Sequence, residues 1–182
     1  FIKPRTALNS PFSDIICPPF VKRLDYEAEI AVIIGKRTKH ISEEEALDSV
    51  FGYMIMHDVS ARDIQFKDKQ FTRGKGIDTF APCGPWITTK DEIDDPQNLT
   101  ILTRVNEEVR QNSSSLNMVI PIKRIISSLS NIMTIEAGDI ISTGTPAGVA
   151  MSMAEPKYLK HGDIVEIAIE KLGKIRNRVT MK

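Results

Sequence analysis

Three acidic residues have the types and spacing to hold a cation. Glu27 and Glu29 lie two residues apart at the start of an apolar run, and Asp58 follows the apolar run that begins at Gly52. In a strand, residues two apart face the same side with Cα atoms roughly 6 to 7 Å apart, so the two glutamates share one patch. Three carboxylates without a His or Cys cluster favour a hard cation such as Mg²⁺, Mn²⁺ or Ca²⁺, which would cancel their mutual repulsion.

Each of these acids also has an ordinary interpretation. Asp25 continues the alternation of the two glutamates, and such a pattern is typical of a solvated strand face. Asp58 could instead cap the turn that follows it.

The histidines share no metal-ligand spacing and are more typical of packing or of the surface than of catalysis; they are His40, His57 and His161. The TGTPAG run lacks the Lys-Ser/Thr ending of a nucleotide-binding loop.

The segments that must position these acids are predicted to be mostly short strands. Apolar alternation or continuous apolar runs predict strands over residues 24–35, 52–56, 100–105, 108–111, 139–142, 163–170 and 174–179. Asn106 and Glu107 would form the two-residue turn of one hairpin, and Leu172 with Gly173 the turn of another. Strands outnumber helices without a regular alternation, which indicates an α+β fold dominated by a mixed sheet.

A few short helices are expected between the strands. Ser42 followed by three glutamates forms a capping-box pattern for a helix that ends by Gly52. Ser60 would cap a brief helix over residues 61–66, and Pro121 would start another helix. On that last helix the apolar residues fall on one face; they are Ile122, Ile125, Ile126 and Leu129. The polar stretch 67–79 is expected to be a loop.

The composition favours one domain without a nucleic-acid or membrane partner. The chain has 182 residues, 41% of them hydrophobic, which suffices for one core. Lys plus Arg equals Asp plus Glu at 24 each, so no global field attracts nucleic acid. The longest apolar runs are far shorter than the roughly 20 residues of a membrane span. Cys17 and Cys83 show no CxxC or paired framework, which indicates a reducing, cytoplasmic location.

Five motifs, in order, resemble the catalytic domain of the fumarylacetoacetate hydrolase family. They are LDYEAEIAVIIGK, GYMIMHDVSARDIQ, GKGIDTFAPCGP, VNEEVRQ and GDIISTGTPAGV. The similarity extends from about Leu24 to the final hairpin. It implies the mixed β-sheet roll of the family's C-terminal domain, with residues 1–182 as one catalytic domain and residues 1–23 as an extended N-terminal segment.

The resemblance also implies roles for individual residues. The expected metal ligands are Glu27, Glu29 and Asp58. The expected substrate-binding residues are Arg62, Gln65, Lys75, Gly144 and Thr145. Lys75 and Arg62 would also be catalytic, with Lys75 moving protons near the metal and Arg62 supplying fixed positive charge. The Thr145 hydroxyl and neighbouring backbone amides would bind the substrate carboxylate.

The function implied is that of a Mg²⁺- or Mn²⁺-dependent enzyme, with Ca²⁺ as a further candidate cation, acting on a small 2-oxo acid. The first expectation is hydrolytic carbon-carbon cleavage of an acylpyruvate. The alternative is isomerase, decarboxylase or tautomerase chemistry on acids of the 5-carboxymethyl-2-hydroxymuconate or oxaloacetate type, which needs the same enolate but no attacking water. A homodimer is also expected.

Two features bear on the choice. Family hydrolases activate water with a His from a segment upstream of an FxKP-like start, and FIKP is where this sequence begins, so we expect that lid segment to lie outside it. Gly76 and Glu107 depart from the family's usual Ser and Gly. A metal-binding interaction protein without turnover is therefore the alternative from another class.

Overall fold

The computed structural model describes the backbone of residues 1–182 and the side chains of residues 1–67 and 69–182. One five-stranded sheet has the order β1-β7-β5-β4-β10, with β1 Leu8–Asn9, β4 Ala28–Ile34, β5 Val50–His57, β7 Ala81–Thr89 and β10 Ile140–Ser142. A second has the order β2-β12-β11-β8-β9, with β2 Ile15–Cys17, β8 Thr100–Val105, β9 Glu108–Ser114, β11 Ile164–Ile169 and β12 Gly173–Met181. A two-stranded sheet pairs β3 (Leu24–Asp25) with β6 (Ser60–Ala61).

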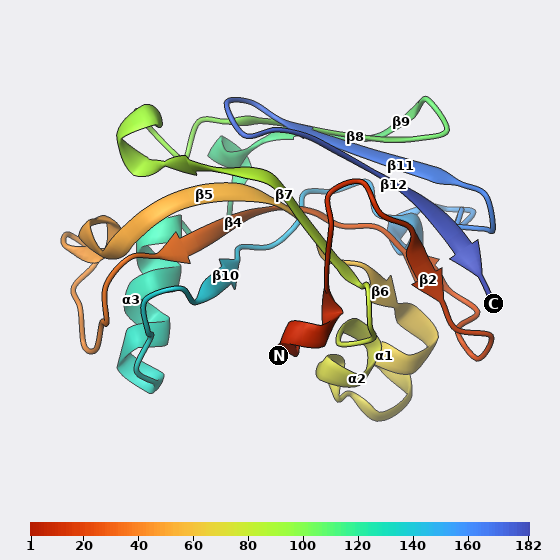
Figure 1. Ribbon diagram of the computed structural model, residues 1–182, viewed down its shortest axis with the longest axis horizontal. Helices are drawn as coiled ribbons and strands as arrows, with labels where there is room; N and C mark the ends of the chain where they lie inside the picture. Colours follow the sequence, from red (N-terminus) through yellow and green to blue (C-terminus); the bar gives the residue numbers. More distant parts are fainter.

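The sheets are mixed. β1 runs parallel to β7 and β2 runs parallel to β12, whereas the pairs β4–β5, β8–β9 and β11–β12 are antiparallel. Both parallel strands come from the N-terminal segment, which therefore edges both large sheets. Figure 1 shows β8, β9, β11 and β12 stacked over β4 and β5. The predicted α+β fold with mixed sheets and a few short helices is confirmed.

The helices are short. The α-helices are α1 (Arg62–Asp68), α2 (Phe71–Lys75) and α3 (Ile122–Ile132), and the 3₁₀ turns cover Arg5–Ala7, Ala46–Ser49, Lys90–Glu92, Ser115–Asn117 and Ala150–Ser152. In Figure 1, α1 and α2 lie together beside β6, and α3 lies near β10. No helix among the described residues is long and apolar enough to cross a membrane.

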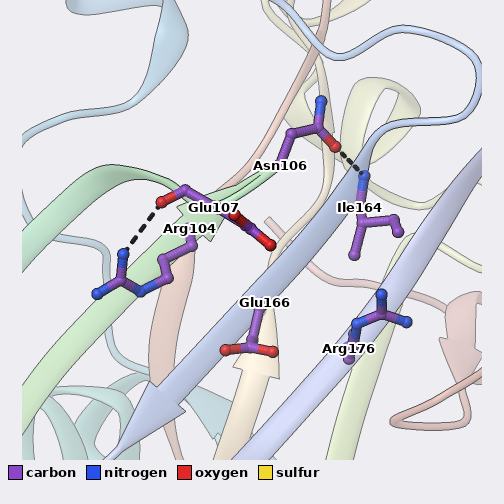
Figure 2. A pocket seen from close by; sticks show the side chains of 6 residues that line it. All are labelled: Arg104, Asn106, Glu107, Ile164, Glu166 and Arg176. Atoms are coloured by element: carbon purple, nitrogen blue, oxygen red, sulfur yellow. Dashed lines mark hydrogen bonds between the residues drawn. The ribbon is translucent and has the colours of Figure 1, made fainter.

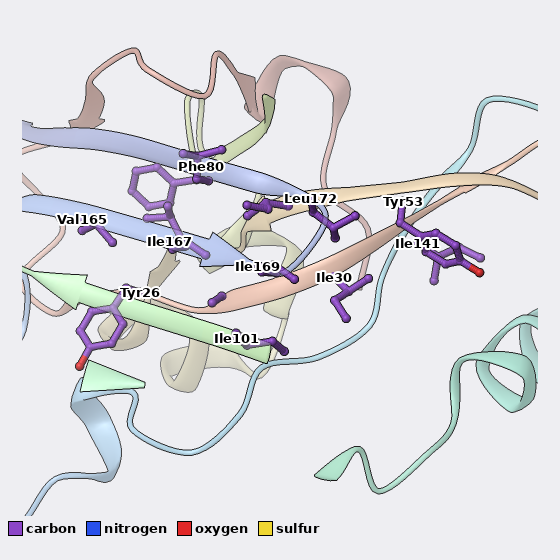
Figure 3. Close-up of a cluster of buried hydrophobic side chains, with 14 of the residues drawn as sticks. Tyr26, Ile30, Tyr53, Phe80, Ile101, Ile141, Val165, Ile167, Ile169 and Leu172 are labelled. Carbon is purple, nitrogen blue, oxygen red and sulfur yellow. The ribbon is translucent and has the colours of Figure 1, made fainter. Parts of the chain in front are cut away.

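The core lies between the two large sheets. Ile167 and Ile169 of β11 are almost fully buried, and Figure 3 shows them in one cluster with Ile30 of β4 and with Phe80. Burying each such side chain contributes roughly 1.5 to 3 kcal/mol. This packing makes β4 and β5 a rigid base for the loop and helices that follow β5.

The strand predicted over residues 24–35 is split in two. β3 pairs with β6, whereas β4 pairs with β5, so the chain exchanges partners between Asp25 and Ala28. The Tyr26 N–H donates to the Asp25 carboxylate at 2.9 Å, and the Tyr26 hydroxyl donates to the Gly148 carbonyl at 2.8 Å. These bonds hold the break between β3 and β4 against the TGTPAG turn. Glu27 lies just before β4 and is therefore outside the β4–β5 pairing.

Two expected helix starts were wrong in detail. Ser42 accepts from the Glu45 N–H at 3.3 Å, but only a 3₁₀ turn follows, because the chain already enters β5 at Val50. Ser60 does not cap α1. Its hydroxyl donates instead to the Asp58 carbonyl at 3.0 Å.

The stretch 67–79, expected to be a loop, contains α2. Gly74 permits α2 to pack closely on α1, since a Cβ there would lie 2.8 Å from the Gln65 nitrogen and 2.9 Å from the Ala61 carbonyl oxygen. Lys75 therefore lies on the last turn of a helix that packs on α1. The remaining expected elements agree, including the hairpin whose turn residues Asn106 and Glu107 have φ of 49° and 71°. The last hairpin turns at residues 170–172, because Gly173 already pairs with Ile169 as the first residue of β12. β1, β2 and β7 were not expected from the sequence.

Candidate metal centre and active site

The three acids proposed from sequence meet at one buried point. One ligand oxygen from each lies within 4.8 Å of the others, and Glu27, Glu29 and Asp58 are 7%, 3% and 1% exposed. Asp58 reaches the glutamates because β5 pairs with β4, and its N–H donates to the Glu27 carbonyl at 2.9 Å. The interpretation of a solvated strand face is therefore wrong.

Glu29 is held by neutral donors. The Ser142 hydroxyl and the Gly144 N–H, the latter at 2.8 Å, both donate to its Oε2. Burial, together with the charges of Asp58 and Glu27, raises the pKa of Glu29 to about 8. Without a bound cation this carboxyl therefore holds a proton at neutral pH, and a cation would displace it.

Two lysines hold Asp58. Lys75 Nζ lies 2.6 Å from Asp58 Oδ2 and 2.8 Å from Glu27 Oε2, so it bridges two of the acids. Lys3 Nζ lies 2.7 Å from Asp58 Oδ1 and also donates to the carbonyls of Val59, Phe80 and Lys75. The N-terminal segment is thus tied directly to the candidate metal centre.

Arg62 connects Glu27 to a fourth buried carboxylate. Its Nη2 lies 2.6 Å from Glu27 Oε1, its Nε donates to Asp25 Oδ2 at 2.9 Å, and its Nη1 donates to Gln65 Oε1 at 2.9 Å. Asp25 is fully buried and also accepts from the Ala150 N–H at 2.8 Å. Asp25 therefore orients Arg62, which in turn holds Glu27.

The charges of this cluster fit a divalent cation. The four buried carboxylates of Asp25, Glu27, Glu29 and Asp58 face the three cationic side chains of Lys3, Arg62 and Lys75. The cluster thus has one excess negative charge, and protonation of Glu29 makes it neutral. A divalent cation with Glu29 ionised would leave the cluster positive by one charge, which suits an anionic ligand. Hard oxygen donors are also the ligands that Mg²⁺ and Mn²⁺ prefer.

The TGTPAG turn lies against the acids through Gly144, whose N–H contacts Glu29. Thr145 follows it and is half-buried, with its hydroxyl accepting from Gln111 Nε2 at 2.8 Å. The structure thus brings the pocket residues expected from sequence around the acidic cluster: Arg62 and Lys75 contact it, Gln65 contacts it through Arg62, and Gly144 and Thr145 border it.

Sequence reasoning missed several buried or half-buried partners of these residues. Asp25 was set aside, and no role was given to Lys3, Gln111 or Ser142. A signal for Asp25 was its place in the same alternation as the two glutamates, directly after an apolar Leu24. For the others, only the contacts reveal the role.

The histidines lie apart from the acidic cluster or are held neutral. His57 is fully buried, and burial together with the charge of Lys3 lowers its pKa to about 3. His40 contacts Asn131, and His161 accepts from the Met181 N–H. The expectation that they serve packing or the surface remains compatible with these positions.

A separate hollow of about 290 Å³ lies on the outer face of the second sheet. Its charged lining comes from neighbouring strands of the sheet, with Glu166 of β11 paired in register with Arg104 of β8 and Arg176 of β12 (Figure 2). Arg104 donates to the Glu107 carbonyl at 3.0 Å. This open groove of opposite charges contains none of the acids of the candidate metal centre. The metal centre is therefore the better candidate for the active site.

Comparisons with known proteins agree with the fold and the motifs. The family profile described as fumarylacetoacetate (FAA) hydrolase, C-terminal, matches residues 1–180. Oxaloacetate tautomerase YisK of Bacillus subtilis is 48% identical over 157 residues, which are 86% of this chain and 52% of that protein. The chain belongs to the fumarylacetoacetate hydrolase family of enzymes.

Solved structures of related proteins superimpose closely. A fumarylacetoacetate hydrolase from Exiguobacterium antarcticum has a TM-score of 0.96 at 43% identity, over 100% of this chain and 66% of that one. A 5-carboxymethyl-2-hydroxymuconate delta-isomerase from Mycobacterium smegmatis has a TM-score of 0.92 at 40% identity, over 100% of this chain and 68% of that one. The chain spans 52% to 71% of the length of the curated relatives that it matches.

Proposed function

We propose that residues 1–182 form a single catalytic domain that interconverts the keto and enol forms of a small 2-oxo acid of the oxaloacetate type, with Mg²⁺ or Mn²⁺. One observation carries this proposal: Glu27, Glu29 and Asp58 converge within 4.8 Å in a buried site, with Lys75 Nζ in contact with two of them. The name of the Bacillus subtilis relative supports the choice of reaction.

Glu27, Glu29 and Asp58 would hold the cation. When bound, Mg²⁺ or Mn²⁺ would supply Lewis-acid stabilisation of the negative charge that develops on the substrate oxygens. Arg62 already engages Glu27 Oε1, Lys3 engages Asp58 Oδ1, and neutral donors engage Glu29 Oε2. Few carboxylate oxygens remain, which favours Mg²⁺ or Mn²⁺ over Ca²⁺, a cation that often takes bidentate carboxylates.

We assign the proton transfer to Lys75. Tautomerisation removes a proton from the carbon next to the keto group and adds a proton at the keto oxygen. Lys75 Nζ is buried and is oriented by Glu27 and Asp58, which supports its role in moving that proton. Arg62, oriented by Gln65 and Asp25, contributes fixed positive charge next to the pocket.

The substrate carboxylate is assigned to Gly144 and Thr145. Gly144 is exposed, Thr145 is half-buried, and the Gly144 N–H contacts Glu29, so this turn forms a border between the acids and solvent. The Gly144 N–H already donates to Glu29, so the Thr145 hydroxyl is the donor left for the ligand, next to a cluster that a divalent cation would make positive. Gly144 has a φ of 98°, which its lack of a side chain permits.

Hydrolysis of an acylpyruvate, the first expectation from sequence, is the second candidate. The structural similarity to the Exiguobacterium antarcticum hydrolase favours it. Hydrolysis needs a group that activates water, and His57, the histidine beside Asp58, is a weak base because its pKa is about 3. Tautomerisation needs no attacking water and therefore asks less of the residues described.

An activity panel tests the proposal. Oxaloacetate, acetylpyruvate and fumarylpyruvate would be supplied with Mg²⁺ or Mn²⁺, with Glu29→Ala as the control. Accelerated enol-to-keto conversion of oxaloacetate that needs the cation and disappears in the control is the expected result. Cleavage of an acylpyruvate would establish hydrolysis instead, loss of carbon dioxide would indicate decarboxylation, and inactivity with all three acids would favour the binding protein.

We also propose a homodimer in the cytoplasm. Cys17 and Cys83 are free thiols, which fits a reducing compartment. Sedimentation equilibrium would measure the oligomeric state, and a monomer at micromolar concentration would contradict the dimer.

A further inference from the structure

Gln111 of β9 joins the glutamate-bearing strand to the TGTPAG turn. Its side chain is 1% exposed. Oε1 accepts from the Ala28 N–H at 3.1 Å and from the Thr103 hydroxyl at 2.9 Å. Nε2 donates to Thr145 Oγ1 at 2.8 Å and to the Pro146 carbonyl at 2.9 Å. Ala28 lies between the two glutamates, so this one amide spans the proposed metal and carboxylate sites.

The orientation of this amide is fixed by its backbone partners. The Ala28 N–H can only donate, so it must face the oxygen of the amide. The Pro146 carbonyl can only accept, so it must face the nitrogen. A flipped amide would lose both bonds, and Nε2 is therefore the atom that meets Thr145.

This orientation determines which way the Thr145 hydroxyl can act. A hydroxyl has one proton to donate and two lone pairs that accept. Because Nε2 is a donor, Thr145 Oγ1 accepts from it, and the hydroxyl proton is left for another partner. Among the described residues, Gln111 is the hydrogen-bond partner of this hydroxyl. Thr145 is half-buried beside exposed Gly144, so this residue borders the solvent from which an anionic ligand would approach.

We infer that Gln111 is a positioning residue that holds the Thr145 hydroxyl as a donor toward the carboxylate of the 2-oxo acid. Gln111 does not touch the ligand itself. Since Thr145 belongs to the proposed pocket, this role rests on the proposed function. With this role, a change at Gln111 alters the affinity for the carboxylate, which depends on the Thr145 hydroxyl, and leaves proton transfer at Lys75 unaffected.

The variant Gln111→Glu tests this role. Glutamate keeps the shape of the side chain and can accept from Ala28 and Thr103, but it cannot donate to Thr145 or to the Pro146 carbonyl. The hydroxyl would then turn its proton to the new carboxylate. Losing one hydrogen bond to a charged group corresponds to a roughly 10- to 100-fold increase in KM for oxaloacetate and in the Kd of oxalate with Mg²⁺. The kcat should change less than about threefold.

Repeating the substitution in a variant without the Thr145 hydroxyl distinguishes the effect of turning the hydroxyl from the effect of the added charge. With Thr145→Val in place, Gln111→Glu should raise KM and the oxalate Kd by less than about threefold, since no hydroxyl remains to be turned. An equal increase in both backgrounds would assign the effect to repulsion or to the lost Pro146 contact and overturn the role. Thr103→Val, which leaves the Nε2 contacts intact, is the matched control and should keep KM within about twofold.

A neutral variant covers the case in which Gln111→Glu does not fold, as judged by thermal unfolding. Gln111→Met removes the donor without charge and should raise the oxalate Kd about threefold or more. Unchanged KM and oxalate Kd in the folded variants would overturn the role. If the wild type binds oxalate but does not turn over oxaloacetate, the proposed reaction fails while the oxalate titrations still decide the role of Gln111; a wild type that binds no oxalate overturns both.

Discussion

Lys3 Nζ lies 2.7 Å from Asp58 Oδ1, so a residue near the start of the chain is an ion-pair partner of a proposed metal ligand. The side chains are 10% and 1% exposed, which makes this a largely buried pair. Lys3 also donates to the Val59 and Phe80 carbonyls at 3.2 and 2.8 Å. The N-terminal segment therefore contributes directly to the candidate centre as well as to the edges of the sheets.

Lys3→Met should destabilise the protein without a cation and make it depend more on one. Removing one partner of a buried pair costs about 3 kcal/mol, because the remaining charge is left without compensation. Mn²⁺ would restore positive charge beside Asp58, so the increase in Tm on adding Mn²⁺ should exceed that of the wild type. Calorimetry with and without Mn²⁺ measures both effects.

A surface lysine provides the control for this change. Lys174 pairs with Glu166 at 3.2 Å in an exposed position, and Lys174→Met should change the free energy of unfolding by less than about 1 kcal/mol. A Lys3→Met variant that behaves like Lys174→Met would show that the buried pair has no role in the centre.

Cation binding should release a proton from Glu29. Its pKa of about 8 means that this carboxyl is mostly protonated at pH 7, whereas a cation binds the ionised form. Apparent Mn²⁺ affinity should therefore rise as pH increases toward 8 and level off above it. Calorimetric titrations in buffers of different ionisation enthalpy should find about 0.9 proton released per Mn²⁺ at pH 7.

The same shift has a consequence for stability. The folded protein without a cation binds the Glu29 proton more tightly than the unfolded chain, whose glutamate has a pKa of 4.5. Its contribution to stability is therefore fully present below pH 4.5 and is lost as pH rises through about 8. In Glu29→Gln both the proton release and this pH dependence should disappear. Proton release that persists in Glu29→Gln would assign it to another group.

Much of the fold followed from local patterns. The alternating and continuous apolar runs predicted β5, β8, β11 and β12, since burial of one or both faces determines these patterns. The split between β3 and β4 was not predictable, because it depends on a change of partner strand and on the Tyr26 hydroxyl reaching Gly148. α2 was missed because Gly74, a helix breaker by propensity, is needed there for close packing on α1.

The candidate site was predictable in its acids and less so in the residues that hold them. Glu27, Glu29 and Asp58 followed from residue type, spacing and the order of the motifs. The roles of Lys3 and Asp25 depend on contacts between segments far apart in the sequence. Lys3 contacts Asp58 and Asp25 contacts Arg62, although the strands β1, β4 and β5 lie between Lys3 and Asp58 along the chain. A single sequence contains no local signal for such pairs.

Asp25→Asn should weaken the centre although Asp25 is not among the proposed ligands. The amide cannot balance the Arg62 guanidinium, and in either orientation its nitrogen would meet donors: Arg62 Nε, now 2.9 Å from Oδ2, or the Tyr26 and Ala150 N–H groups at Oδ1. Leaving a buried guanidinium without this partner should cost about 3 kcal/mol. Because Arg62 also holds Glu27, Mn²⁺ affinity should fall as well. Urea unfolding and Mn²⁺ titration measure the two effects.

Asp163→Asn is the matched control for that variant. Asp163 accepts from Asn106 Nδ2 at 2.7 Å and from the Lys160 N–H at 2.8 Å in exposed turns. Its replacement should leave Mn²⁺ affinity within about twofold. Equal Mn²⁺ affinities for Asp25→Asn and the wild type would contradict the role of Asp25 in orienting Arg62.

Gly148→Ala should disturb the TGTPAG turn and the carboxylate subsite together. Gly148 has a φ of +108°, and a Cβ there would lie 2.0 Å from the Arg110 carbonyl oxygen, so backbone must move to admit it. The expected cost is about 3 kcal/mol. Gly138→Ala is the control, since Gly138 has a φ of +93° with nothing within 4 Å of a Cβ, and should cost about 1 kcal/mol. Because the displaced turn contains Thr145, KM for oxaloacetate should rise in Gly148→Ala. It should stay near the wild-type value in Gly138→Ala. Equal KM values in the two variants would mean that the turn does not set substrate affinity.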